Sequence, residues 1–360
     1  MATDLFEPVE AGALRLANRI VMTAMTRARA GAGDVPTPLM AEYYRQRASA
    51  GLIISEGIAV SPMARGYYRT PGLYTDAQLQ GWRMVTDAVH AAGGLIQAQL
   101  WHVGRISHPD TLPPGRHPLA PSAITAETSS VYAGEGFLPC APPVAMTQAD
   151  IVTTIDEFVH AARGAMASGF DGVQIHGGNG YLIDQFLKAG ANHRTDAYGG
   201  AIMNRIRFVL ELTGAVAAAV GSGRLSLRIA PTTMVNDVSD PDPQTLFVRL
   251  CEELGRFDLA FLDVVEGQTV GPREDGGFDP DLLRRAYRGL YLGNNGYTPD
   301  LAIAARAAGK VDLVGFGRAF ITNPDLVERM RVGRPIAPEP ERDAYYGGDA
   351  AGYTDFPRYA

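Results

Sequence analysis

Residues 147–176 have the sequence TQADIVTTIDEFVHAARGAMASGFDGVQIH, in which a helical pattern is followed directly by a strand pattern. Thr147 and Asp150 have the spacing of a capping box, which marks the start of a helix. Apolar residues then recur every three or four positions, at Ile151, Ile155, Phe158, Ala162 and Ala165. The short apolar run Gly172–His176 indicates a buried strand. This segment therefore predicts one helix–strand unit of an α/β fold.

The same alternation extends in both directions along the chain. Eight short apolar runs predict strands: Ile20–Met22, Leu52–Ser55, Leu95–Gln99, Gly172–His176, Leu225–Arg228, Ala260–Val264, Gly289–Leu292 and Val311–Gly315. Helix starts are indicated by a second capping box, Thr75 with Gln78, and by an N-cap residue before proline at Thr37-Pro38, Asp242-Pro243, Asp279-Pro280, Thr298-Pro299 and Asn323-Pro324. Eight strand–helix units in 360 residues favour a (β/α)8 TIM barrel over two doubly wound domains.

Residues 1–360 are expected to form a single domain, because no low-complexity linker and no change of composition divides them. The longest irregular segment, residues 103–146, is rich in proline, glycine and serine and follows the third predicted strand. We interpret it as a loop or hairpin insertion that covers one end of the barrel. An N-terminal hairpin is expected to cap the barrel as well.

The composition limits the classes of partner. Hydrophobic residues make up 46% of the chain and charged residues 20%, as in a globular protein, and the net charge of -7 argues against a general nucleic-acid surface. Cys140 and Cys251 leave a single disulfide open, but a reduced cytosolic protein is favoured. The N-terminal residues lack the basic and apolar regions of a signal peptide, and no apolar run reaches membrane-spanning length. We therefore expect a cytoplasmic protein.

Three predicted strands carry polar side chains toward the barrel interior if their apolar residues face the helices. The inward residues are Gln97, Gln99 and Trp101 on one strand, Gly172, Gln174 and His176 on the next, and Ser226 and Arg228 on the third. These side chains could satisfy one another in a polar core. Their convergence from three strand ends instead favours a ligand site, because TIM-barrel active sites are built at those ends.

The glycine-rich segments favour a phosphate site over a Rossmann fingerprint. Gly315-Phe316-Gly317-Arg318 lacks the third glycine of that fingerprint. It follows the eighth strand, and Gly293-Asn294-Asn295-Gly296 follows the seventh, where TIM barrels commonly bind phosphate. The alternative is that these glycines only form tight turns. A phosphate there, with Gln99 and an aromatic residue on strand three and Arg228 on strand five, fits flavin mononucleotide (FMN), whose reduced ring Arg228 could stabilise.

Several motifs occur together and in one order along nearly the whole chain. They are Leu5-Phe6-Glu7-Pro8, Asn18-Arg19-Ile20-Val21, Met25-Thr26-Arg27, Glu42-Tyr43-Tyr44-Arg45-Gln46-Arg47-Ala48, Gly51-Leu52-Ile53-Ile54-Ser55-Glu56, Gln99-Leu100-Trp101-His102-Val103-Gly104-Arg105, His176-Gly177-Gly178-Asn179-Gly180-Tyr181-Leu182, Arg194-Thr195-Asp196, Tyr198-Gly199-Gly200, Asn323-Pro324-Asp325-Leu326 and Tyr346-Gly347-Gly348. With these motifs the chain resembles the Old Yellow Enzyme family of FMN-dependent ene-reductases.

The resemblance implies a role for individual residues. Thr26 is expected at the flavin O4, Arg228 at N1, and Ala24, Met25, Gly57 and Gln99 along the ring, while Gly293, Asn294, Asn295, Gly317 and Arg318 hold the phosphate. His176 and Asn179 are expected to bind the activating oxygen of the substrate, Tyr181 to donate the proton, and Tyr67, Trp101 and Tyr346 to shape the pocket. Three positions depart from the family pattern: Ala24 stands where relatives usually have proline, Gly178 is smaller than the usual residue, and Met203 replaces an expected acidic residue.

The implied reaction is reduction of enones, enals, maleimides or nitroalkenes at the expense of NAD(P)H, in a monomer or homodimer. Two donors on the substrate oxygen would stabilise the developing enolate, and Tyr181 would protonate the α-carbon from the face opposite the hydride. No cluster has metal-ligand spacing. One rival is a non-catalytic flavin- or steroid-binding barrel. A metal- or lysine-dependent hydrolase or aldolase is disfavoured, because Lys188 and Lys310 are the only lysines and neither ends a predicted strand.

Overall fold

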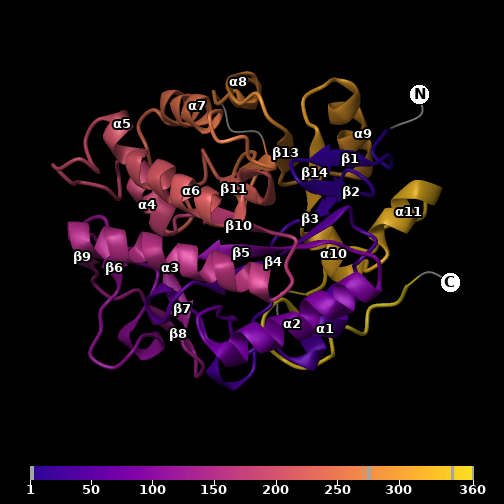
Figure 1. Cartoon of the computed structure of the whole chain (residues 1–360), viewed down its shortest axis with the longest axis horizontal. Helices are drawn as coiled ribbons and strands as arrows, with labels where there is room; N and C mark the ends of the chain where they lie inside the picture. Colours follow the sequence, from indigo (N-terminus) through magenta and orange to yellow (C-terminus); the bar gives the residue numbers. More distant parts are fainter. Residues whose placement is uncertain (1–3, 270, 274–276, 342–343, 359–360) are drawn as a thin grey trace.

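The computed structural model describes residues 4–269, 271–273, 277–341 and 344–358 (Figure 1). Residues 1–3, part of the segment examined for a signal peptide, therefore lie outside it. A closed barrel is formed by β3 (Ile20–Met22), β4 (Leu52–Ala59), β5 (Ile96–Trp101), β10 (Gly172–Gly177), β11 (Leu225–Ile229), β12 (Phe261–Val265), β13 (Tyr291–Asn294) and β14 (Leu313–Phe316). Each strand pairs in parallel with its neighbours, and β14 closes on β3. The predicted TIM barrel is confirmed.

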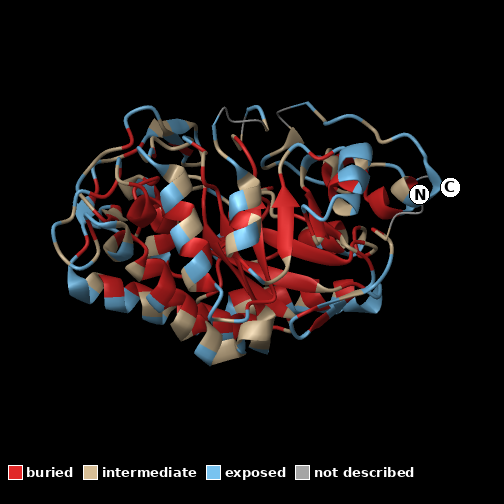
Figure 2. Ribbon diagram, turned by 90° about the horizontal axis from the view of Figure 1, so that it is seen from above, coloured by how far each residue is buried: buried red, intermediate tan, exposed pale blue. Residues whose placement is uncertain are grey.

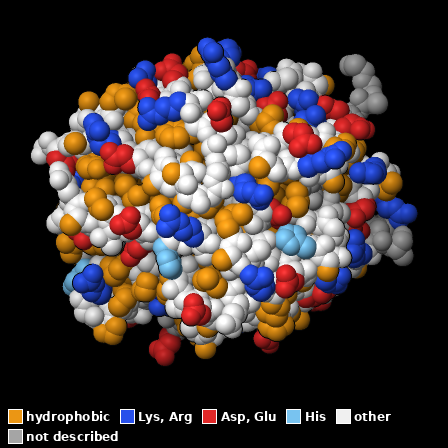
Figure 3. Space-filling view, in the orientation of Figure 1, with side chains coloured by type: hydrophobic (Ala, Val, Ile, Leu, Met, Phe, Trp, Pro, Cys, Tyr) orange, Lys and Arg blue, Asp and Glu red, His pale blue; other side chains and the backbone are white. Residues whose placement is uncertain are grey.

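Helices surround the barrel and present one face to it. They are α1 (Pro38–Arg45), α2 (Asp76–Ala91), α3 (Gln148–Ala167), α4 (Leu182–Leu187), α5 (Ile202–Arg205), α6 (Arg207–Val220), α7 (Pro243–Leu254), α8 (Pro280–Ala286), α9 (Pro299–Ala307), α10 (Arg318–Thr322) and α11 (Leu326–Val332). Figure 2 shows buried residues on the inner faces of helices whose outer faces are exposed. In α3 the residues Ile151, Phe158, Ala162 and Ala165 are buried, as their spacing predicts. Acidic and basic side chains are interspersed over the surface seen in Figure 3.

Most of the predicted helix starts are confirmed. Both capping boxes form, and the side chains of Thr37, Asp242, Asp279 and Thr298 each accept a hydrogen bond from the first turn of a helix. The start predicted at Asn323 is wrong. Asn323 ends α10, and its side-chain oxygen accepts from Ala337 N at 2.8 Å, so it connects that helix to a later segment and is not the cap of α11.

The end of the barrel at which the strands begin is closed by apolar residues. The predicted N-terminal hairpin is present as β1 (Val9–Ala11) and β2 (Leu14–Leu16), paired antiparallel. Its turn contacts the segment before β11, where Ala13 N donates to Gly223 O at 2.8 Å. Side chains of the hairpin pack with residues of the barrel interior in one cluster: Ala11, Leu14, Leu16, Val21, Leu52, Ile54, Ala260, Phe261, Leu292 and Leu313. The hairpin therefore caps this end of the barrel.

The insertion after β5 covers the opposite end. It contains the parallel pair β6 (Leu119–Ala120) and β9 (Val144–Ala145) and the antiparallel hairpin β7 (Ser130–Tyr132) and β8 (Phe137–Pro139). Its buried residues pack on Trp101 at the end of β5, with Tyr67 and Tyr181 beside them. Cys140 lies in this cluster, and both it and Cys251 are free thiols, so the structure contains no disulfide between them. The predicted loop or hairpin insertion is confirmed.

Candidate active site

A network of polar side chains fills the barrel near the strand ends covered by the insertion. Gln99 Nε2 donates to Gln174 Oε1 at 2.7 Å, and Gln174 Nε2 donates to Asp263 Oδ2 at 3.2 Å. Arg228 Nε donates to the same carboxylate oxygen at 2.7 Å, and Asn294 Nδ2 donates to Asp263 Oδ1 at 3.1 Å. Sequence reasoning missed Asp263, although the same alternation rule applied to β12 would have placed it inward. The inward polar residues thus satisfy one another in part.

Among the described side chains of the barrel strands, three buried polar atoms remain without a partner. They are Arg228 Nη2, His176 Nδ1 and Trp101 Nε1, and each is buried. A buried polar group without a hydrogen bond costs about 1–3 kcal/mol. Unpaired polar atoms gathered at the carboxyl ends of three barrel strands favour a ligand site, because a ligand can supply the missing hydrogen-bond partners.

The segment that contains Thr26 is held in place by the buried carboxylate of Glu56. Glu56 lies where β4 shifts register against β5, between Ile54 and Gly57. Its Oε2 accepts from Arg27 N at 3.2 Å and from Ala28 N at 3.1 Å. Burial raises the pKa of Glu56, and these two backbone donors oppose the shift. Glu56 is a further residue that was not predicted, and it holds the chain beside Thr26 in place.

Two glycines of the predicted cofactor site allow close approach of neighbouring groups. A Cβ on Gly57 would lie 2.7 Å from the Trp101 ring, and one on Gly317 would lie 2.9 Å from Met25 Sδ. Ala24, Met25 and Thr26 are all half-buried after β3. Since β14 pairs with β3 and β4 with β5, the predicted ring-lining residues are brought to one end of the barrel. The absence of a side chain at Gly57 therefore makes room for the Trp101 ring, and its absence at Gly317 makes room for the Met25 side chain.

An aromatic cluster surrounds Tyr181. Its hydroxyl lies 3.3 Å from the Tyr67 hydroxyl, and its ring centroid lies 5.0 Å from that of Trp101 and 5.4 Å from that of His176. Burial raises the pKa of Tyr181 to about 12, so the phenol stays protonated at neutral pH. Burial, assisted by the charge of Arg228, lowers the pKa of His176 to about 3, so the imidazole is neutral and has one N–H to donate. The structure thus combines a neutral donor and a protonated phenol.

Asn179 adopts a left-handed backbone conformation, with φ of 58°. Its Oδ1 accepts from Thr269 Oγ1 at 2.6 Å, and its backbone oxygen accepts from Asn236 Nδ2 at 2.8 Å. Sequence reasoning predicted neither of these two supports. Packing explains why position 178 is a glycine, because a Cβ there would lie 2.8 Å from Ala230 Cβ. Close packing of β10 against the end of β11 requires this small residue.

The two predicted phosphate loops begin inside the strands and not after them, because Gly293 and Asn294 end β13, and Gly315 and Phe316 end β14. Their polar side chains already have partners. Asn294 binds Asp263, and Asn295 Nδ2 donates to Glu266 O at 2.8 Å and to Gln268 O at 2.9 Å. Arg318 begins α10 and forms a half-exposed ion pair with Glu339 at 3.3 Å. The asparagine side chains are therefore already engaged within the protein.

Tyr346 reaches the site from the C-terminal segment. Arg27 anchors this segment, because its guanidinium donates to Tyr345 O and Ala344 O, each at 2.9 Å. Tyr346 is 56% exposed. Burial is the main cause of the raised pKa of Tyr181, and Tyr346 is close enough to raise that pKa further. It therefore lies at the rim of the aromatic cluster.

The donor set fits a flavin. Its ring would need a cation at the pyrimidine edge and hydrogen-bonding groups along that edge. Arg228 supplies an unpaired Nη2, and Gln99 and Thr26 supply the polar groups. Among the described residues there is no group of three or more His, Cys, Asp or Glu side chains placed to hold a metal ion. None of the described helices is long and apolar enough to cross a membrane.

Comparison with known proteins identifies the family. The profile of the NADH:flavin oxidoreductase / NADH oxidase family matches residues 4–337. The chain is 40% identical to 12-oxophytodienoate reductase 7 of Oryza sativa subsp. japonica, over 98% of this chain and 94% of the relative. It is also 40% identical to a probable flavin mononucleotide-dependent alkene reductase of Leishmania infantum, over 98% and 97%.

Solved structures agree with these matches. Morphinone reductase superimposes with a TM-score of 0.95 at 42% identity, over 100% of this chain and 97% of that one. The same enzyme has been solved in complex with tetrahydroNAD, with a TM-score of 0.94. The chain therefore belongs to the NADH:flavin oxidoreductase family, the Old Yellow Enzyme family, and is an NAD(P)H-dependent flavin oxidoreductase of the alkene-reductase type.

Proposed function

We propose that this protein binds FMN and uses NAD(P)H to reduce carbon–carbon double bonds conjugated to a carbonyl or nitro group. The observation that carries the proposal is the grouping of a neutral His176, an oriented Asn179 and a protonated Tyr181 at one end of the barrel. The substrates are enones, enals, maleimides and nitroalkenes. The names of the relatives, an alkene reductase, a 12-oxophytodienoate reductase and morphinone reductase, support a reductase of this kind.

The residues proposed to hold FMN fall into two groups. Arg228, Gln99, Thr26, Gly57, Ala24 and Met25 would hold the ring, and Gly293, Asn294, Asn295, Gly317 and Arg318 would hold the phosphate. The unpaired Arg228 Nη2 supports the first group, because an acceptor on the ring would remove its desolvation cost. When bound, the flavin supplies the hydride. A phosphate bound by the residues proposed to hold it would lie close to the Arg318–Glu339 ion pair.

His176 and Asn179 are proposed to donate hydrogen bonds to the activating oxygen of the substrate. Charge develops on that oxygen as the β-carbon accepts hydride, so two donors would lower the barrier by roughly a few kcal/mol. Tyr181 then gives its proton to the α-carbon from the opposite face, a net trans addition. The Tyr67 hydroxyl, 3.3 Å away, can donate to the tyrosinate oxygen that remains. Tyr67, Trp101 and Tyr346 enclose the substrate, and the nicotinamide uses the same space before it, which predicts ping-pong kinetics.

An anaerobic absorption spectrum tests the proposal. The purified protein should show a bound flavin that bleaches on addition of NAD(P)H and recovers its colour when cyclohexenone is added. Release of FMN on denaturation identifies the cofactor. A yellow protein that NAD(P)H does not bleach would support the rival, a non-catalytic flavin-binding barrel, and folded protein that takes up no FMN would refute the proposal.

The oxygen-binding role of His176 has its own test. Phenols mimic the enolate oxygen, so His176→Ala should weaken the binding of a phenol without loss of flavin. The matched control is His90→Ala, because His90 is an exposed residue of α2 whose ring is hydrogen-bonded to Asp171, away from the barrel interior. Unchanged affinity for the phenol in His176→Ala would remove His176 from this role.

A further inference from the structure

Two threonines form a directed chain of hydrogen bonds that ends on the side chain of Asn179. Thr269 N donates to Thr233 Oγ1 at 3.4 Å, and Thr233 Oγ1 donates to Thr269 Oγ1 at 3.1 Å. Thr269 Oγ1 then donates to Asn179 Oδ1 at 2.6 Å. A hydroxyl has one proton to donate, and the Thr233 hydroxyl donates its proton to Thr269 Oγ1. The proton of Thr269 is therefore the one that Asn179 Oδ1 accepts.

This chain decides which end of the Asn179 amide is free. An asparagine side chain has an acceptor end and a donor end of almost equal shape, so packing alone distinguishes them poorly. A hydroxyl that donates to Oδ1 fixes the acceptor end on the Thr269 side. The Nδ2 group is then left to donate elsewhere, as a substrate oxygen requires.

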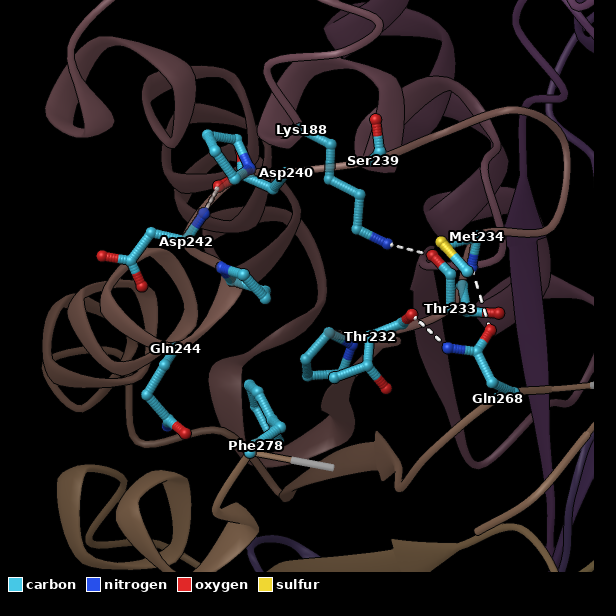
Figure 4. A pocket seen from close by; sticks show the side chains of 14 residues that line it. Lys188, Thr232, Thr233, Met234, Ser239, Asp240, Asp242, Gln244, Gln268 and Phe278 are labelled. Atoms are coloured by element: carbon cyan, nitrogen blue, oxygen red, sulfur yellow. Dashed lines mark hydrogen bonds between the residues drawn. The ribbon is translucent and has the colours of Figure 1, made fainter. Parts of the chain in front are cut away.

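The loop of Thr233 is held by further hydrogen bonds, and Figure 4 shows those that Lys188 and Gln268 make beside a neighbouring cavity. Lys188 Nζ donates to Thr233 O at 2.8 Å and to Asp184 Oδ2 at 3.1 Å. The same carboxylate oxygen accepts from Gly180 N at 2.9 Å, next to Asn179 in the chain. One buried ion pair thus connects the loop of Thr233 to the loop of Asn179.

A second connection joins the loop of Thr233 to the loop of Thr269. Gln268 Oε1 accepts from Met234 N at 3.2 Å, and Gln268 Nε2 donates to Thr232 O at 2.6 Å. Gln268 precedes Thr269 directly in the sequence. The side chain of Gln268 thus binds the backbone on both sides of Thr233, at Thr232 and Met234, and so holds the two threonines at hydrogen-bonding distance.

We propose that Thr269, supported by Thr233, is a positioning residue that holds the Asn179 amide with its donor end toward the substrate. The pocket is then selective for ligands that offer an acceptor oxygen. This inference rests on the proposed function, since it concerns the same oxygen-binding pair. It adds a residue that acts only through Asn179 and touches neither substrate nor flavin.

The experiment measures the dissociation constant of 4-chlorophenol for the FMN-loaded protein by calorimetry. Thr269→Val keeps the shape of the side chain and removes the hydroxyl, so the dissociation constant should rise by about 3- to 10-fold, the value of one hydrogen bond. Thr269→Ser should restore affinity to within about twofold of the wild-type protein. Thr233→Val should cause a smaller rise than Thr269→Val. An unchanged dissociation constant in Thr269→Val would overturn the proposal.

Thr232→Val is the matched control. Its Oγ1 is buried with no partner in the described residues, and it lies next to Thr233 in the same loop. Removing this hydroxyl should leave phenol binding unchanged. A loss in Thr232→Val equal to that in Thr269→Val would overturn the proposal, because it would attribute the effect to general disturbance of the loops.

A double-mutant cycle separates positioning from a change of pocket shape. In the Asn179→Ala background, Thr269→Val should cause no further change in the dissociation constant, because the group it orients is gone. A further loss of similar size in that background would overturn the proposal. Failure of the proposed function gives a different result, namely that the wild-type protein binds neither FMN nor the phenol.

Discussion

The two ends of the barrel are built from the same eight strands and differ in what they leave unsatisfied. At the end covered by the N-terminal hairpin, ten buried apolar residues, three of them from the hairpin, form one cluster. At the other end, Gln99, Gln174, Arg228 and Asp263 form a polar network that leaves Arg228 Nη2 unpaired. The alternation of side chains is the same at both ends. The difference teaches that a closed apolar end provides stability, whereas the open polar end keeps donors available for ligands.

Tyr181→Phe should produce the largest functional effect at the polar end. Loss of the proton donor should slow reduction of the alkene by about 10²- to 10⁴-fold, while reduction of the flavin by NAD(P)H is unchanged. The unfolding free energy should fall by about 1–2 kcal/mol, because the side-chain hydrogen bonds of the Tyr181 hydroxyl to Tyr67 and to Asn236 are lost. Stopped-flow measurement of the two half-reactions checks this. Equal losses in both would remove Tyr181 from the donor role.

Asp263→Asn should show that the polar end also contributes to stability. Stability would then not be a property of the apolar end alone. Asp263 and Arg228 form an ion pair with side-chain exposures of 0% and 5%. Removing one partner of a buried pair costs about 3–5 kcal/mol, because the remaining charge stays buried. Urea unfolding measures the loss. Glu42→Gln, in the exposed pair with Arg45, is the control and should cost less than about 1 kcal/mol.

Gly12→Ala tests the closure of the apolar end. Gly12 has a φ of 61°, and a Cβ there would lie 2.5 Å from Gly223 O. Gly93 has a similar φ of 80° with nothing within 4 Å of its Cβ position, so Gly93→Ala measures the backbone strain alone, about 1–2 kcal/mol. Gly12→Ala should cost at least about 1 kcal/mol more, with the catalytic rate of folded protein unchanged. Equal losses in the two variants would mean that the hairpin contact is dispensable.

The smallest expected effect is that of pH on substrate binding. The pKa of His176 is lowered by burial to about 3 and that of Tyr181 is raised to about 12, so neither changes its charge between about pH 5.5 and 9.5. The dissociation constant of neutral cyclohexenone should therefore vary by less than about twofold over that range. A step near pH 6.5, the ordinary pKa of histidine, would contradict the burial of His176 at the polar end.

The same lowered pKa has a consequence for stability. Because the folded protein resists protonation of His176, the unfolded chain binds the proton first as the pH falls. The contribution of this neutral histidine is fully present above about pH 6.5 and is lost as the pH falls toward 3. Unfolding free energies measured along this range in the wild-type protein and in His176→Ala isolate it.

The sequence by itself determined the barrel, the caps and the inward polar residues, because these depend on period and on local hydrogen bonds. Strands of period two gave the inward positions of Gln99, Gln174 and Arg228, and the capping boxes gave the starts of α2 and α3. The predicted start at Asn323 was wrong because its side chain binds Ala337, which is remote in the chain. Local pattern cannot reveal such a partner.

Only the tertiary structure decided how the candidate site is supported. Three supporting contacts join residues far apart in the sequence. Asp263 binds Arg228 across 35 residues, Glu56 binds the backbone of Ala28 near Thr26 across 28, and Thr269 binds Asn179 across 90. Such contacts form only when the barrel closes and brings the strand ends together. Whether an inward side chain is satisfied or left with an unpaired donor depends on these neighbours in space, and no periodicity in the sequence encodes that.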